Sequence, residues 1–132
     1  MSGRFEAQVA RFGTTSLERY DRVRRASILE LFSLVIDRSP VDTGRFRGNW
    51  QTTVGSPAQG TIERLDRGGD AAKAEVLANL GALFDVVCLT NNLAYSEALE
   101  DGYSAQAPAG MVGPSVVAWP RIVAAKARAY AK

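Results

Sequence analysis

The chain has 132 residues, which is enough for one compact domain and short for two. Its hydrophobic content of 46% and charged content of 23% are typical of globular proteins and argue against a disordered chain. The chain has no histidine, which excludes an imidazole base and a histidine-ligated metal, and its single cysteine excludes an intrachain disulfide. The net charge of +2 is too small to indicate nucleic-acid binding by itself.

Charge is divided unevenly along the chain. Residues 1–50 carry nine basic and six acidic side chains, residues 51–101 carry three and eight, and residues 102–132 carry four basic and no acidic side chains. Solvated faces can produce this division, and so can acidic and basic surfaces that meet between subunits. The N-terminus lacks a signal pattern and no apolar run is long enough to span a membrane, so we expect a soluble protein from a reducing compartment.

Two helices are predicted at the N-terminus. Residues 4–12 have apolar side chains at helical spacing, and Gly13 is placed to end this short helix. Thr15 followed by Glu18 is a capping-box pattern, which predicts the start of a second, longer helix. Its apolar face continues at spacings of three and four residues as far as Val35.

A turn is predicted after the second helix. The dipeptide Ser39-Pro40 ends that helix, because a residue before proline is disfavoured in the α region. The turn itself is formed by residues 41–44, and it contains the tripeptide Asp42-Thr43-Gly44. The same tripeptide occurs in aspartic proteases, but there it lies between apolar strands, whereas Arg45 follows it here. We therefore predict a structural turn and no catalytic carboxylate.

The middle of the chain alternates short strands with a helix. Alternating or continuous runs of apolar and β-branched residues predict strands over residues 49–54, 61–65 and 85–90. The first of these carries Trp50, a candidate core residue. Asp70 is placed as the N-cap of a helix over residues 71–80.

The C-terminal part ends in a further helix. Residues 93–100 predict one or two helical turns, and residues 103–113 show little periodicity. The last helix begins near Pro114 and is kinked or restarted at Pro120. The order of elements predicts an α+β fold in one domain over residues 1–132. In it a small antiparallel or mixed sheet packs against a long N-terminal helix and a C-terminal helix.

Two charged groups are candidates for functional sites. Glu97 and Glu100 share a helical face beside Asp101, so they could start a hydrolase or Mg²⁺ site. A solvated or subunit-contacting acidic edge explains them better, because no other acidic run supports such chemistry. The basic stretch 19–25 (RYDRVRR) and the basic C-terminus leave contact with DNA as an alternative. No P-loop, dinucleotide fingerprint or zinc spacing occurs, so we predict no catalytic residue, cofactor or metal.

The segment 103–112 (YSAQAPAGMV) is small, apolar and uncharged. Long irregular loops are usually functional or disordered. With Tyr95, Tyr103 and Met111 around it, this loop is predicted to be covered by a partner, and a plain surface loop is the alternative.

Two blocks of the sequence resemble a known family. Residues 39–50 (SPVDTGRFRGNW) and 91–112 (NNLAYSEALEDGYSAQAPAGMV) are similar, in this order, to the neck and tail-completion proteins of long-tailed phages, a family that includes the minor tail protein Z type. The predicted order of helices agrees with that family. Gly113-Pro114 and Pro120 depart from it, because they interrupt what is usually one clean final helix.

The resemblance implies a structural role and no enzymatic one. Copies would form a ring, with a hexamer expected from the symmetry of the tail, that completes the tail and helps join it to the head. The protein would be made in the host bacterial cytoplasm and reside in the tail or neck of the virion. Its partners would be itself and adjacent tail-tube, tail-terminator or head-closure proteins. Weak contact with DNA in the channel is compatible with this role, and no membrane or small-molecule substrate is implied.

Residues and resemblance together define two groups. The predicted subunit or partner interface consists of Tyr95, Glu97, Glu100, Tyr103, Gln106, Pro108 and Met111. The predicted structural turn and core consist of Pro40, Asp42, Thr43, Gly44 and Trp50.

Overall fold

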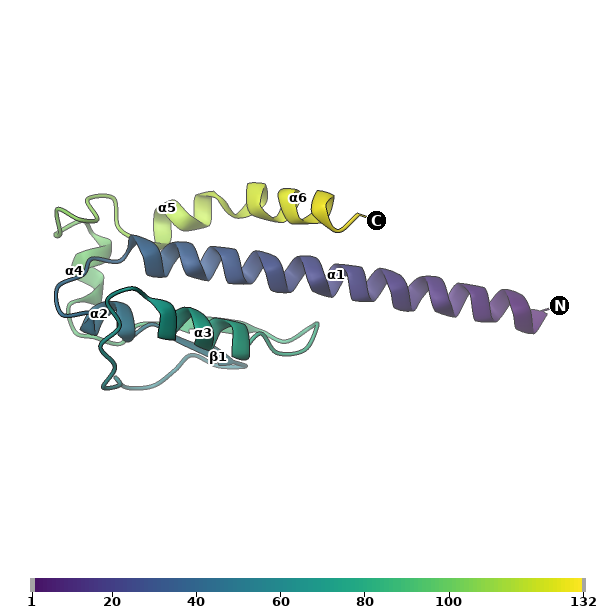
Figure 1. Ribbon diagram of the computed structural model, residues 1–132, viewed down its shortest axis with the longest axis horizontal. Coiled ribbons are helices and arrows are strands. Elements are labelled where there is room, and N and C mark those ends of the chain that lie inside the picture. The colour runs from purple at the N-terminus through teal and green to yellow at the C-terminus, as the bar shows by residue number, and fades with distance from the viewer. Residues whose placement is uncertain (1, 132) are drawn as a thin grey trace.

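A computed structural model describes residues 2–131 of the chain. Helix α1 (Ser2–Arg38) runs the length of the molecule, and the rest of the chain packs around its C-terminal half (Figure 1). In that view one side of α1 faces α3 (Asp70–Ala78) and the strands, and the other faces α5 (Val112–Val117) and α6 (Trp119–Ala129). The short helices α2 (Arg45–Gly48) and α4 (Ser96–Glu100) lie at the end opposite the N-terminus. The predicted α+β fold is confirmed.

The N-terminal region forms one helix, so the predicted break at Gly13 is wrong. The helix continues through Gly13, and the hydroxyl of Thr14 donates to the carbonyl of Ala10 at 3.0 Å within the helix. Thr15 and Glu18 are therefore interior helix residues and form no capping box. One glycine costs a helix about 1 kcal/mol, which does not break it when its neighbours are adequate helix formers. The predicted end before Ser39-Pro40 is confirmed.

The sheet has two antiparallel strands, β1 (Gln51–Val54) and β2 (Val87–Thr90), paired from Gln51 opposite Thr90 to Val54 opposite Val87. Both are shorter than predicted, and β2 is half-buried where a buried strand was expected. The predicted strand over residues 61–65 is wrong. Hydrogen bonds from polar side chains hold this segment in place of the backbone bonds that a third strand would make.

Two of these polar contacts come from Arg64 and Asn49. Arg64 Nε donates to Gly48 O at 2.8 Å, its Nη2 donates to Trp50 O at 2.8 Å, and Asn49 Oδ1 accepts from the amide of Ile62 at 2.9 Å. The cap of α3 also differs from the prediction. Asp66 Oδ2, not Asp70, accepts from Ala72 N at 2.8 Å, and Asp70 is the first helical residue.

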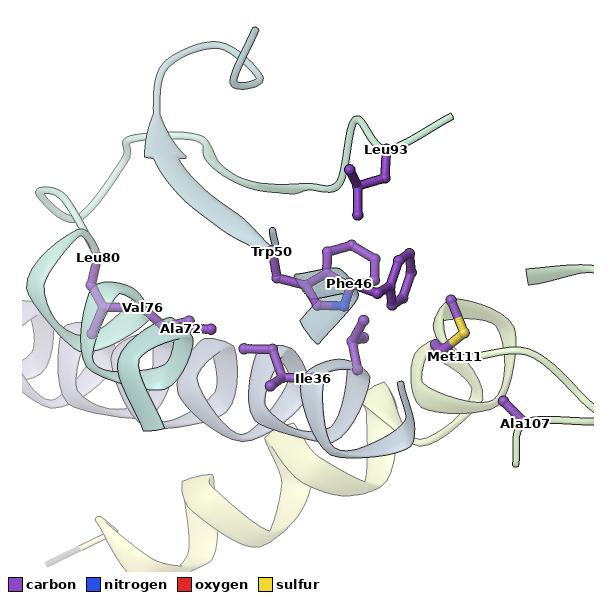
Figure 2. Close-up of a cluster of buried hydrophobic side chains, with 10 residues drawn as sticks. Ile36, Phe46, Trp50, Ala72, Val76, Leu80, Leu93, Ala107 and Met111 are labelled. Atoms are coloured by element: carbon purple, nitrogen blue, oxygen red, sulfur yellow. The ribbon is translucent and has the colours of Figure 1, made fainter. Parts of the chain in front are cut away.

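The hydrophobic core lies between α1, α3 and the α2–β1 junction. Ile36 of α1 and Val76 of α3 are fully buried. Phe46 and Trp50 pack edge to face, with ring centroids 5.9 Å apart and planes at 75°, between Ile36 and the side chain of Leu93 (Figure 2). Met111 enters this cluster from the segment before α5, so both blocks identified in the sequence contribute to one core.

Candidate interface at the α2–α4 end

The blocks 39–50 and 91–112 are brought together at the end of the molecule farthest from its N-terminus (Figure 1). Gln106 bonds the backbone of Val41 in both directions: its Oε1 accepts from the amide at 2.9 Å, and its Nε2 donates to the carbonyl at 3.1 Å. Asn91 Nδ2 donates to Phe46 O at 2.9 Å. We call this region, formed by the two blocks, the α2–α4 end.

Trp50 is fixed to the C-terminus of α1. Only 5% of its surface is exposed, and its Nε1 donates to Ser39 Oγ at 2.7 Å. The same hydroxyl donates to Val35 O at 2.8 Å. Arg47 completes the junction, because its Nη2 donates to Asp37 O at 3.0 Å and to Ser39 O at 2.7 Å, which satisfies carbonyls left free at the helix end.

The turn before α2 requires glycine at position 44. Gly44 has φ of 92°, and a Cβ there would lie 2.7 Å from the amide nitrogen of Arg67. Pro40 is half-buried, whereas Asp42 and Thr43 are exposed on the turn. Thr43 Oγ1 accepts from Arg45 N at 3.2 Å, a local bond that stabilises the turn. This arrangement holds no pair of facing carboxylates of the kind that aspartic proteases use.

Glu100 caps the N-terminus of α5. Its Oε1 accepts from the amides of Met111 at 3.0 Å and Val112 at 2.9 Å, and its Oε2 accepts from Gly113 at 2.9 Å. Burial by itself raises the pKa of this carboxyl. The three amide bonds act against burial and dominate, so the pKa lies below its ordinary value. The carboxylate is thus held ionised and is occupied within its own chain.

This corrects the expectation for the acidic cluster. Glu100 was predicted to face a partner, but its oxygens are taken by backbone amides, while Glu97 remains exposed. The two carboxylates therefore do not form a matched acid–base pair. The sequence held one signal of this cap. The helix at 112 begins without a Ser, Thr, Asp or Asn N-cap of its own, and so it needs an acceptor from elsewhere.

The segment 103–112 is folded back onto the body. Met111 is 1% exposed and lies in the core, so its predicted place in an interface is wrong. Gln106 is exposed, and its side-chain amide is bonded to the backbone of Val41 as described above. Ala107 is also buried. The loop was expected to be covered by a partner, whereas its own chain buries Ala107, Gly110 and Met111 and leaves most of the other residues exposed.

Five predicted interface residues are exposed: Tyr95, Glu97, Tyr103, Gln106 and Pro108. Tyr103 is 82% exposed, and the ring of Tyr95 lies 5.8 Å from that of Phe46. A cavity of about 300 Å³ opens beside them between the turn and α4. Its lining includes Val41, Thr43, Phe46, Tyr95, Leu99 and Gln106. With the exposed carboxylate of Asp101, this surface is aromatic and acidic.

The basic stretch on α1 is only partly available to an external ligand. Arg24 Nη2 donates to Leu80 O at 2.6 Å, and Arg25 Nη1 donates to Gly81 O at 3.0 Å, so both fasten the segment that follows α3 to α1. Arg22 is exposed on α1, and Arg121 and Arg128 are exposed on α6. The surface predicted to contact DNA is therefore smaller than the sequence indicated.

Within residues 2–131, no cluster of three or more potential metal-ligating side chains occurs. Across the same residues, no helix is both long and apolar enough to cross a membrane. Comparison of the chain with protein-family models, with curated proteins and with solved structures finds no match.

Proposed function

We propose that this chain is a structural protein of a tailed-phage virion, forming a ring in the tail or neck that completes the tail and helps join it to the head. The observation that carries the proposal is the convergence of the two family-like blocks. They are separated by 40 residues in the sequence, yet they share one core and are tied by the reciprocal Gln106–Val41 bonds. Their exposed residues form a single surface at one end of the molecule.

A closed ring of identical copies needs two different surfaces that complement each other. The α2–α4 end offers one of them, with exposed Tyr95 and Tyr103 beside the acidic Glu97. The other is the outer face of α6, where Arg121 and Arg128 lie seven residues apart on one side of the helix and are exposed. Opposite charge on the two surfaces favours head-to-tail contact and disfavours contact between like ends.

The direct test is to remove the protein from the particle. Phage made from a genome lacking this chain should yield heads and tails that fail to join or tails of abnormal length, and electron microscopy of normal particles should place the chain in a ring at the tail end or neck. Normal infectious tails without the chain would refute the proposal.

A surface variant tests which end of the molecule is used. Tyr103→Asp should leave the unfolding free energy unchanged within about 0.5 kcal/mol, because the side chain is exposed. It should nevertheless reduce ring formation and joining. Phe84→Asp is the matched control, since Phe84 is equally exposed but lies in the loop before β2, away from the proposed contact. Equal effects of the two substitutions on assembly would argue against the α2–α4 end as an interface.

A further inference from the structure

The two outer edges of the β1–β2 sheet differ in how their backbone groups are paired. In an antiparallel pair, successive residues alternate between bonding the other strand and facing away from it. The bond from Gly55 N to Val86 O, at 2.8 Å, sets this alternation, so Thr52 faces away from β2. Its amide donates to Glu75 Oε1 at 2.9 Å, and its carbonyl accepts from Asn79 Nδ2 at 3.0 Å. The outer edge of β1 is therefore closed by side chains of its own molecule.

The outer edge of β2 is open. By the same alternation, Val87 and Leu89 direct their amides and carbonyls away from β1. Within residues 2–131, no hydrogen bond joins these four groups to the rest of the chain. Every residue of β2 keeps part of its surface exposed. The strand has neither a proline nor a charged side chain, the usual devices that keep an open edge from pairing with another chain.

We propose that β2 pairs antiparallel with β2 of a second copy, about a two-fold axis at Cys88, and that the two sheets become one sheet of four strands. In this register Val87 of each copy faces Leu89 of the other, and each facing pair exchanges two hydrogen bonds. Four bonds then satisfy all eight outward groups of the two strands. A second copy thus brings the matching number of donors and acceptors at the matching spacing.

The neighbouring residues select this register. An axis at Val87 would place Leu89 opposite Asp85, whose amide already donates to Ala82 O at 2.9 Å. An axis at Leu89 would place Val87 opposite Asn91, which lies beyond the end of β2. Only the axis at Cys88 keeps both facing pairs within the two strands.

Side chains along the edge also suit a second copy. Residues 86–92 (VVCLTNN) carry no charge, so two copies meet without like-charge repulsion. Val86 is 63% exposed and lies on the same face of the sheet as Cys88. In the proposed register it comes opposite Thr90 of the second copy. The pairing therefore covers apolar surface that the single chain leaves exposed.

The inference goes beyond the proposed function and does not rest on it. β2 ends before the second block begins, so it takes no part in the α2–α4 end, and it is separate from the outer face of α6. A two-fold contact joins copies in pairs, whereas the ring uses a head-to-tail contact. Pairing can be measured on free protein, and Tyr103→Asp, which tests the ring, should leave it unchanged.

The single cysteine of the unaltered chain tests the register directly. At the axis the two Cys88 residues form a non-hydrogen-bonded pair with Cα atoms about 4.5 Å apart, within the range of a disulfide. Diamide, which takes up the two protons and two electrons of the thiols, should therefore convert the protein at about 100 µM to a covalent dimer on non-reducing gels. Absence of this dimer would overturn the proposal.

A displaced cysteine is the control for random collision. In the double variant Cys88→Ser, Val86→Cys the new thiol replaces a more exposed side chain. The two residues 86 lie four positions apart along the paired strands, about 13 Å, which is beyond the reach of a disulfide. This variant should stay monomeric under diamide. Cross-linking equal to that of the unaltered chain would overturn the proposed register.

A proline at the edge tests the hydrogen bonds. The contact is small, so we expect a dissociation constant on the order of 100 µM, measured by sedimentation velocity. Val87→Pro removes an amide that the β1–β2 pair does not use, so the monomer should fold, as circular dichroism would show. The substitution takes away two of the four bonds between copies and should raise the constant at least about tenfold. A chain that stays monomeric up to about 1 mM would overturn the proposal, even if another protein pairs with β2.

A charge at the axis covers the case in which Val87→Pro fails to fold. Cys88→Asp places two carboxylates opposite each other and should also raise the dissociation constant at least about tenfold. Cys88→Ser is the matched control, because it adds no charge, and it should leave the constant within about threefold of the original. Equal constants for Cys88→Asp and Cys88→Ser would overturn the axis at Cys88.

Discussion

The α2–α4 end and the N-terminal part of α1, residues 2–20, belong to one small protein but are stabilised in different ways. We call the second region the α1 arm. At the α2–α4 end, side chains distant in sequence satisfy the backbone: Arg47 binds carbonyls at the end of α1, and Glu100 binds three amides at the start of α5. In the arm, the side chain of Thr14 bonds locally, to the carbonyl of Ala10, and Phe12 is 75% exposed. The first region is fixed by its own chain, whereas the second still has apolar surface to bury.

This difference separates stability from association. Substitutions at buried positions of the α2–α4 end should lower the unfolding free energy of the monomer. Substitutions on the arm should leave that free energy nearly unchanged and act on contact with other molecules. The predictions below test this division, beginning with the largest expected effect.

Trp50→Ala should have the largest effect on stability. The ring is buried between Phe46 and α1, and its indole N–H is bonded to Ser39. Removal leaves a cavity and should cost about 3–5 kcal/mol of unfolding free energy, measured by urea denaturation of dilute protein.

Phe12→Ala is the matched change on the arm. It also removes an aromatic ring, but from an exposed site, and should alter the unfolding free energy of the monomer by less than about 0.5 kcal/mol. A comparable loss in both variants would show that the arm packs on the body of its own molecule.

Glu100→Gln should have a smaller effect that depends on pH. The amide keeps one acceptor oxygen but places an N–H donor toward one of the three backbone amides, at a cost of about 1–3 kcal/mol at pH 7. Because the folded pKa of Glu100 is lowered, its contribution to stability is present above the ordinary pKa and is lost as the pH falls through the folded value.

The unfolding free energies of Glu100→Gln and of the unaltered chain should therefore become more similar as the pH is lowered from about 5 toward 3. Urea denaturation of both proteins at each pH measures this difference. Glu97→Gln serves as the control, because Glu97 is exposed, lies three residues before Glu100 in α4 and accepts none of the three amide bonds. It should show no such trend. A constant difference at every pH would mean that the cap does not depend on the charge of Glu100.

Local patterns in the sequence predicted the elements better than their ends and partners. The α+β class, the end of α1 before Ser39-Pro40 and the helical turns near Glu100 follow from periodicity and proline sterics, which act over a few residues. The two-stranded sheet does not. Residues 61–65 have a strand-like composition, but Arg64 and Asn49 supply the hydrogen bonds that a third strand would have made.

The candidate interface was predictable only in part, for a related reason. Tyr95 and Tyr103 are exposed, as an interface requires. Met111, in the same uncharged loop as Tyr103, is buried in the core, and Glu100, in the same acidic cluster as Glu97, accepts backbone amides of its own chain. Which residues of a loop face the core depends on contacts between positions far apart in the sequence, such as Gln106 with Val41. Composition does not encode those contacts.

Gly13 gives a small predicted effect that is centred on the arm, and it distinguishes the two regions most directly. A Cβ at this position would meet no atom within 4 Å, so Gly13→Ala should simply favour the helix, by up to about 1 kcal/mol. In dilute monomer, amide exchange around residue 13 should slow by up to about fivefold, and the global unfolding free energy should rise by no more than about 1 kcal/mol. Gly48→Ala is the contrasting change, because a Cβ there would collide with the carbonyl oxygen of Arg64 and should destabilise the whole domain. Faster exchange in Gly13→Ala would mean that Gly13 marks a real break in α1, and the α1 arm would then no longer be a continuation of the helix that the body holds.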